Sequence, residues 1–195
     1  MVESITLNGR CLEFDTEAHT YTVDGIAVPS VTQVVRNRFP DMYRTVPEPV
    51  LRAAADRGSA IHAAIERYCQ TGWDRGLQEL TGFKALCEVY DITQISNELP
   101  VIICDGDEPV MAGTTDLVFD RGGLLCGGDI KTTARLDREY LECQLNLYRI
   151  GYEQTYGVRW DKLYALHLRG TVKTLTEIPV NEDLARDIIR EVLKC

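Results

Sequence analysis

The feature that most constrains the fold of this sequence is a glycine pair, Gly122-Gly123, between two runs with strand character. Residues 112–120 read Ala-Gly-Thr-Thr-Asp-Leu-Val-Phe-Asp, and residues 124–131 read Leu-Leu-Cys-Gly-Gly-Asp-Ile-Lys. A two-residue Gly-Gly connection is typical of a tight β-hairpin, because both turn residues adopt positive φ. The sequence therefore predicts an antiparallel strand pair.

Folding about this turn also predicts which side chains meet. If Arg121 pairs with Leu124, Asp116 is expected directly opposite Asp129. Side chains alternate along a strand, so Lys131 is expected on the same face as Asp129. Carboxylates on facing residues, with Cβ atoms roughly 5 Å apart, repel each other. A shared divalent cation would make them a ligand pair, and this is our leading hypothesis.

Charge and ligand chemistry favour such an ion. Two aspartates and one lysine carry a net −1, a divalent cation makes +1, and a phosphodiester brings the site to zero. Hard oxygen ligands favour Mg²⁺ or Mn²⁺ over Zn²⁺, and Lys131 would orient water or neutralise charge on the phosphate. The Asp-x-Lys pattern alone equally describes a surface salt pair, but a carboxylate after Leu-Leu-Cys-Gly-Gly is expensive to bury unless paired.

The totals describe one domain of ordinary size. The chain has 195 residues and a formal charge of −9, which argues against broad non-specific adhesion to nucleic acid. This charge does not exclude a local basic cleft, because residues 36–57 contain several arginines. Seven cysteines without a CxxC spacing indicate reduced, mostly buried thiols. The sequence shows no signal segment and no apolar run of membrane-spanning length, so we expect a cytoplasmic protein.

Along the chain, turn, cap and periodicity signals predict an α/β sandwich around one mixed sheet, with the core order helix, three strands, helix, strand. Extra elements flank this core at both ends. The expected elements are a β-meander over residues 1–30, a helix opened by a Ser30/Gln33 capping box, a helix at 50–69, helical residues 75–91 interrupted at Thr81-Gly82, a strand at 95–104, the hairpin, a helix at 138–156, a hairpin at 162–168 and 172–180, and a helix from the Asn181 cap to about 193.

Two helices carry further candidate residues. His62 stands among small residues, with Gly58 and Glu66 at four-residue spacing on the same face. It is interpreted either as a structural histidine or as a metal ligand, with Glu66 as its support or as a solvated charge. Gln144 and Tyr148 share a helix face and would reach phosphate or hold Lys131. The other tyrosines and histidines considered are assigned no chemistry. Tyr140 and Tyr152 are interpreted as core packing, and His19 and His167 as surface or strand residues.

Together these motifs resemble the RecB-type, phage exonuclease-like branch of the PD-(D/E)XK nuclease superfamily. In that branch a helical histidine, a Gly-x-x-Asp strand, an Asp-x-Lys strand and a Gln-x-x-x-Tyr helix follow in this order. The corresponding residues are His62, Gly113-Thr-Thr-Asp116, Asp129-Ile-Lys131 and Gln144-Leu-Asn-Leu-Tyr148. The resemblance runs from about residue 12 to 168 and implies a restriction-endonuclease-like core of order αβββαβ.

The resemblance also implies roles for these residues. His62, Asp116 and Asp129, with the Ile130 carbonyl, would bind Mg²⁺ or Mn²⁺, and Lys131 would be catalytic together with the two aspartates. Gln144 and Tyr148 would face DNA, and Arg57 and Ser59 beside the histidine are further expected substrate contacts. Glu98 matches an acidic position on the first core strand but is assigned no role.

The implied function is a metal-dependent deoxyribonuclease, more specifically an exonuclease acting on the ends of linear DNA. The alternatives are a catalytically silent module of the same fold that binds nucleic acid or protein, and a hydrolase of small phosphate esters. DNA is the expected partner; a recombination or single-strand-binding protein and an oligomer stay open, and no membrane association is expected. Late cysteines Cys143 and Cys195 are too far apart for an iron–sulfur cluster.

Overall fold

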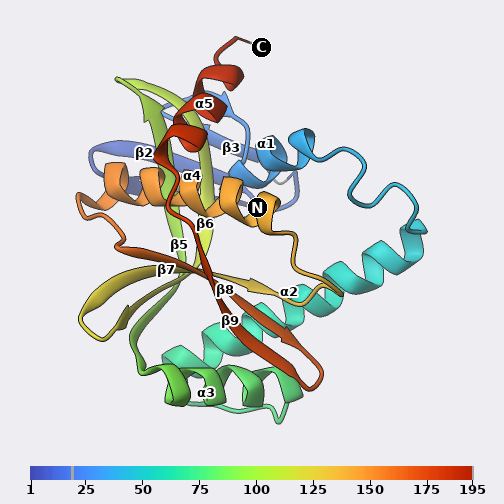
Figure 1. Cartoon of the computed structure of the whole chain (residues 1–195). Coiled ribbons are helices and arrows are strands. Elements are labelled where there is room, and N and C mark those ends of the chain that lie inside the picture. Colours follow the sequence, from blue (N-terminus) through green and yellow to red (C-terminus); the bar gives the residue numbers. More distant parts are fainter. Residues whose placement is uncertain (19, 195) are drawn as a thin grey trace.

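The computed structural model describes residues 1–18 and 20–194 (Figure 1). His19 and Cys195 lie outside the described residues. The chain opens with an antiparallel four-stranded sheet of β1 (Val2–Leu7), β2 (Arg10–Asp15), β3 (Thr20–Val23) and β4 (Ile26–Val28), in sequence order. Asn8-Gly9 and Asp24-Gly25 connect its strands with positive φ at all four residues, so the predicted β-meander is confirmed.

A second sheet of five strands forms the centre of the molecule. It contains β5 (Ile92–Asp105), β6 (Glu108–Arg121), β7 (Leu124–Lys131), β8 (Lys162–Arg169) and β9 (Val172–Ile178), again in sequence order. Strands β7 and β8 are parallel, and the other neighbours are antiparallel. The sheet is therefore mixed, because helix α4 (Arg138–Tyr156) carries the chain back between β7 and β8.

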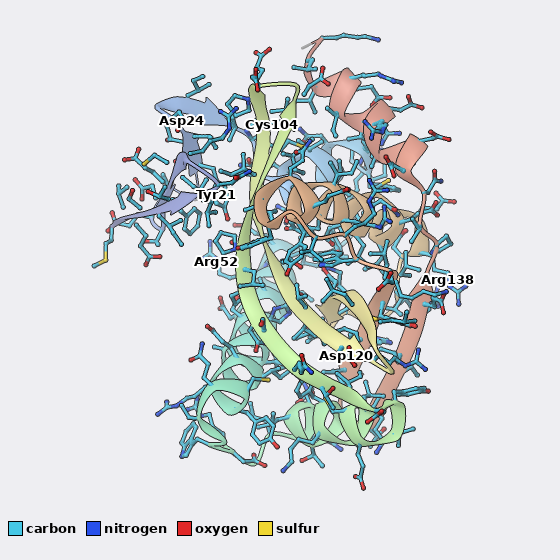
Figure 2. All side chains as sticks on the ribbon, turned by 90° about the vertical axis from the view of Figure 1, so that its left-hand side faces the viewer. Tyr21, Asp24, Arg52, Cys104, Asp120 and Arg138 are labelled. Carbon is cyan, nitrogen blue, oxygen red and sulfur yellow. The ribbon has the colours of Figure 1, made fainter. Side chains whose placement is uncertain are left out.

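Helices cover both faces of this sheet, which gives the predicted α/β architecture (Figure 1). On one face α1 (Val31–Arg38), α4 and α5 (Glu182–Val192) contribute to one hydrophobic cluster. On the other, α2 (Glu48–Thr71) and α3 (Gln78–Tyr90) pack on β6, β7 and β8 through a second cluster. The meander packs on β5 and β6, and Figure 2 shows Tyr21 and Asp24 beside the end of β5 that carries Cys104.

The central hairpin has the predicted register. Gly122 and Gly123 adopt φ of 63° and 82°, and the ladder runs from Arg121↔Leu124 to Leu117↔Gly128. Asp120 lies at the tip of this hairpin (Figure 2), where its side chain accepts a hydrogen bond from the Gly123 amide. Asp116 and Asp129 stand one step beyond the last pair of the ladder.

The packing around Gly127 explains why one of the two residues before Asp129 is a glycine. A Cβ built on Gly127 would lie 1.9 Å from Cε3 of Trp160, because the indole packs directly against the strand backbone at this residue. Trp160 is fully buried. The connection from α4 to β8 is thus packed directly on β7, which fixes the parallel strand next to the one that carries Asp129.

Two helices differ from the sequence prediction. Helix α3 is continuous through Gly82, whose missing side chain admits Leu168 of β8, with a built Cβ 3.3 Å from Leu168 Cδ2. Helix α2 is longer than predicted, and its residues Ala54 and Ala55 are exposed. Its first half extends past the sheet, so burial starts only near Ile61.

Other sequence predictions are confirmed in detail. Ser30 and Gln33 form the capping box of α1, helix α4 has the predicted bounds, and Asn181 caps α5. Strand β9 ends two residues before the predicted Val180. Cys11 is exposed, in contrast to the expectation of mostly buried thiols, whereas Cys126 and Cys143 are buried. Among the described residues, no helix is long and apolar enough to span a bilayer.

Candidate metal centre

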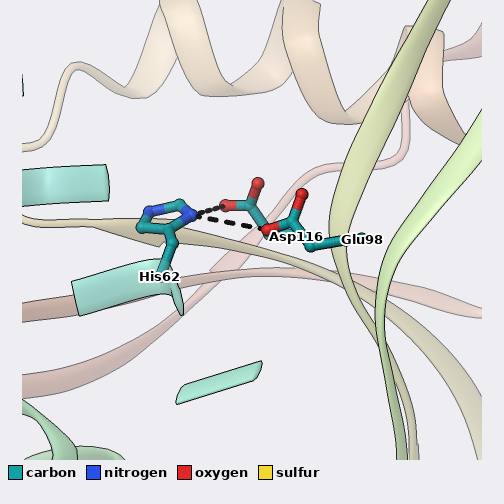
Figure 3. A group of neighbouring side chains, drawn as sticks. All are labelled: His62, Glu98 and Asp116. Atoms are coloured by element: carbon teal, nitrogen blue, oxygen red, sulfur yellow. Dashed lines mark ion pairs between the residues drawn. The ribbon is translucent and has the colours of Figure 1, made fainter. Parts of the chain in front are cut away.

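His62 lies where α2 crosses the end of β7. Its Nε2 is 3.1 Å from the Ile130 carbonyl oxygen, and its Nδ1 is 3.7 Å from Asp116 Oδ2 and 3.9 Å from Glu98 Oε1 (Figure 3). One turn earlier, a Cβ on Gly58 would be 3.3 Å from Thr132 Oγ1. The small residue lets α2 approach the end of β7 closely.

Asp116 is held by the neighbouring strand. The Ile130 amide donates a hydrogen bond to Asp116 Oδ2 at 2.7 Å, so the carboxylate takes the place of a backbone carbonyl just beyond the β6–β7 ladder. Its side chain is 17% exposed. The aspartate is therefore fixed in orientation and still reachable from one side.

Glu98 completes this group from β5. Its neighbours are paired as Asn97↔Leu117 and Leu99↔Thr115, which puts Glu98 across from Asp116. The backbone of Glu98 has a φ of 50°, a left-handed conformation that costs a non-glycine residue free energy and is concentrated at functional sites. Figure 3 shows its carboxylate beside that of Asp116, on the side toward His62.

These three residues fit a divalent cation. One ligand atom from each of His62, Glu98 and Asp116 lies within 4.8 Å of the other two. Two carboxylates and an imidazole form a hard-to-borderline donor set suited to Mg²⁺ or Mn²⁺. A metal-binding histidine commonly donates its second ring N–H to a backbone carbonyl, and His62 Nε2 is placed to do so with Ile130. The Ile130 carbonyl, predicted as a ligand, here contacts His62.

Asp129 occupies a separate position next to Lys131. Lys131 Nζ lies 2.9 Å from Asp129 Oδ1 and donates a hydrogen bond to it, and it is 2.8 Å from Oδ2. Asp129 is 2% exposed, and its Oδ2 accepts no hydrogen bond within the described residues. Asp129 is not part of the converging group of His62, Glu98 and Asp116, so its predicted role as a metal ligand stays a prediction.

Lys131 has a second partner in Gln144. The lysine Nζ donates to Gln144 Oε1 at 3.1 Å, which is one of the two roles that the sequence suggested for this glutamine. Both Gln144 and Tyr148 are 5% exposed. Tyr148 packs against Gly113, where a built Cβ would be 3.0 Å from its Cε1. Neither side chain offers much surface to DNA in this conformation.

The pKa values of the group reflect burial and mutual charge. Burial lowers the pKa of His62, but Asp116, Glu98 and Asp129 outweigh it and raise the value to about 9. Burial raises the pKa of Asp129 to about 6, against the opposing effect of Lys131. Burial also raises the pKa of Asp116. The carboxylates thus carry their charges at a cost in the metal-free protein, which a cation would relieve.

The remaining predicted residues lie outside this group. Arg57 pairs with Glu79 of α3, and Ser59 is exposed on α2 without a hydrogen bond within the described part of the chain. Glu66 accepts a hydrogen bond from Gln70 and, within the described residues, forms no hydrogen bond or ion pair with His62. His167 Nε2 is 2.8 Å from the Thr133 carbonyl oxygen, so it has a structural partner.

Comparisons with known proteins give no family for this chain. No protein-family model matches it, and no curated protein matches its sequence significantly. Among solved structures, one titled "Crystal structure of SSO0001" is similar with a TM-score of 0.48 and 16% sequence identity, over 86% of this chain and 75% of that one. The functional argument therefore depends on the site itself.

Proposed function

We propose that this protein is a Mg²⁺- or Mn²⁺-dependent deoxyribonuclease with a restriction-endonuclease-like core, acting on the ends of linear DNA. The observation that carries the proposal is the convergence of His62, Glu98 and Asp116 ligand atoms within 4.8 Å, beside the Asp129–Lys131 pair. The order helix, three antiparallel strands, helix, parallel strand supports the core assignment. The preference for DNA ends rests on the family resemblance.

Each residue has a distinct task in this proposal. His62, Glu98 and Asp116 would hold the ion, and Ile130 orients two of them through its amide and carbonyl groups. When bound, the ion supplies Lewis-acid polarisation of the phosphate and activation of water.

The lysine and its partners act beside the ion. Asp129 and Gln144 fix the Lys131 ammonium group. Lys131 would orient the attacking water or neutralise the charge that builds on the phosphate in the transition state.

One observation favours a second candidate, a catalytically silent binding module of the same fold. Asp129 already has an ion-pair partner in Lys131 at 2.8 Å, so the Asp129–Lys131 pair forms without an ion and without substrate. In that case the protein would bind DNA or a partner protein without turnover.

The test uses end-labelled linear DNA and, separately, circular DNA, each with Mn²⁺, with Mg²⁺ and with a chelator. Wild type is compared with Lys131→Ala, Asp116→Asn and, as a remote control, Asp183→Asn on α5. Metal-dependent loss of the linear form alone, with the circular form intact, in wild type and the control but not in the two site variants supports an exonuclease.

The other outcomes are equally informative. Cleavage of the circular form indicates an endonuclease. Binding without cleavage in every condition supports the module, and full activity of Lys131→Ala overturns the site assignment.

A further inference from the structure

The inclusion of Glu98 changes the charge balance of the site. With His62 neutral, as a metal ligand must be, the three carboxylates of Glu98, Asp116 and Asp129 and the ammonium group of Lys131 sum to a formal charge of −2. One divalent cation brings the group to zero, and an incoming phosphodiester makes it −1. A further positive group of the chain is therefore expected where the substrate strand leaves the metal cluster.

Tyr140 marks the surface next to Lys131. The lysine Nζ is 5.7 Å from the centre of the Tyr140 ring, within the range of a cation–π contact. Tyr140 stands in the first turn of α4, where the Asp137 carboxylate accepts a hydrogen bond from its amide at 3.0 Å. This helix cap fixes the backbone of Tyr140, whose side chain is only partly buried.

Arg36 lies in the last turn of α1. The ring of Phe39, the residue that ends α1, is 5.6 Å from that of Tyr140, so α1 meets the start of α4 here. Burial raises the pKa of Tyr140, whereas the positive charges of Lys131 and Arg36 both act to lower it. Tyr140 thus lies within the electrostatic influence of two cations, Lys131 and Arg36.

Arg36 also differs from its neighbour Arg38. Arg38 is tied to Glu191 of α5. Arg36 is exposed and forms no ion pair within residues 1–18 and 20–194. An exposed guanidinium group without a carboxylate partner, close to a phosphodiester site, is well suited to bind a second phosphate.

We propose that Arg36 and Tyr140 form a subsite for the nucleotide adjacent to the scissile phosphate. Arg36 binds the neighbouring phosphate, and the open part of the Tyr140 ring stacks on the sugar or base. This inference rests on the proposed nuclease function and deepens it. The preferred substrate is then a polynucleotide strand and not a single phosphodiester.

The test compares a labelled oligonucleotide with bis(4-nitrophenyl) phosphate, which has one phosphate and no neighbouring nucleotide. Arg36→Ala is expected to lower the ratio of the two kcat/KM values about tenfold, and Tyr140→Leu several-fold. The matched control is Arg38→Ala, which removes the same charge from the same helical turn and is expected to keep the wild-type ratio.

A binding assay separates this inference from the nuclease proposal. Fluorescence anisotropy of the oligonucleotide with Lys131→Ala in Mn²⁺ is measured with and without Arg36→Ala, at several salt concentrations. Loss of the arginine is expected to weaken binding and to reduce the slope of log Kd against log salt by about 1. If wild type cleaves neither substrate but loss of Arg36 still weakens binding and lowers the salt slope, the nuclease proposal fails and the subsite stands. An equal effect of Arg38→Ala, or no effect of Arg36→Ala, overturns the subsite.

Discussion

The carboxylate of Asp116 and the backbone amide of Ile130 form a 2.7 Å hydrogen bond that joins β6 to β7 just past their ladder. The aspartate therefore has a structural and a chemical task. Asn has the same shape, and its side-chain oxygen can accept the same hydrogen bond. These two tasks can be separated by one substitution.

Asp116→Asn is expected to fold normally and to lose DNA cleavage by more than about 100-fold, because a ligand charge is removed. Burial raises the pKa of Asp116, so the charged form is disfavoured in the metal-free fold. The variant should therefore be at least as stable as wild type in chelator, as measured by thermal unfolding. Asp120→Asn at the hairpin tip is the isosteric control and should retain cleavage.

The left-handed backbone of Glu98, at a φ of 50°, predicts an inversion of the usual ranking of Ala and Gly. In an ordinary strand Gly is less stable than Ala by roughly 0.5–1 kcal/mol. At Glu98 the Cβ itself causes the strain, so Glu98→Gly should be more stable than Glu98→Ala by about 1 kcal/mol. Denaturant unfolding in chelator measures this difference.

Both Glu98 variants should bind Mn²⁺ more weakly than wild type, since each lacks the carboxylate. The same two substitutions at Thr114, in the neighbouring strand, provide the control. There the Ala variant is expected to be more stable than the Gly variant. If Glu98→Ala proves the more stable of the two, the left-handed assignment is wrong.

Glu98 also shows why part of the site escaped sequence analysis. Asp105 pairs with Glu108 across the β5–β6 turn, and counting back from that pair without interruption would place Glu98 opposite Thr115. The register shifts by one residue between Ile103 and Cys104, which moves Glu98 opposite Asp116. Nothing in local composition announces such a bulge, and a shift of one residue reverses the face of every side chain that follows.

The features that sequence analysis predicted well are local. The Gly122-Gly123 turn fixes its own register, and the Ser30 and Asn181 caps mark helix starts, because each depends on residues within a few positions. The separation of Asp129 from the converging ligand atoms depends instead on Lys131 and on contacts between distant segments. Charge counting around one hairpin could not predict contacts between distant segments.

The packing of Trp160 on Gly127 predicts a large stability effect away from the site. Gly127→Ala is expected to cost about 3 kcal/mol, because its Cβ would lie 1.9 Å from Trp160 Cε3. In the double variant with Trp160→Leu the clash is absent, so the two costs should fall short of additivity by about 1–3 kcal/mol. Additive costs in denaturant unfolding would contradict this packing.

The pKa of His62 predicts how the metal-free protein responds to pH. Its folded-state value of about 9 lies above the ordinary 6.5, because Asp116 and Glu98 favour the imidazolium. The resulting stability is fully present below pH 6.5 and is lost as the pH rises through 9. The shift corresponds to at most about 3 kcal/mol.

Unfolding in chelator between pH 6 and 10, compared with His62→Gln, measures this contribution directly. The stability difference between the two proteins should shrink across that window, and a constant difference would contradict the charge coupling. Because Nδ1 faces both carboxylates at 3.7 and 3.9 Å, a bound cation must displace the proton from that nitrogen. Mn²⁺ titrations at pH 8 should therefore release close to one proton in wild type and almost none in His62→Gln, as measured by calorimetry in buffers of different ionisation enthalpy.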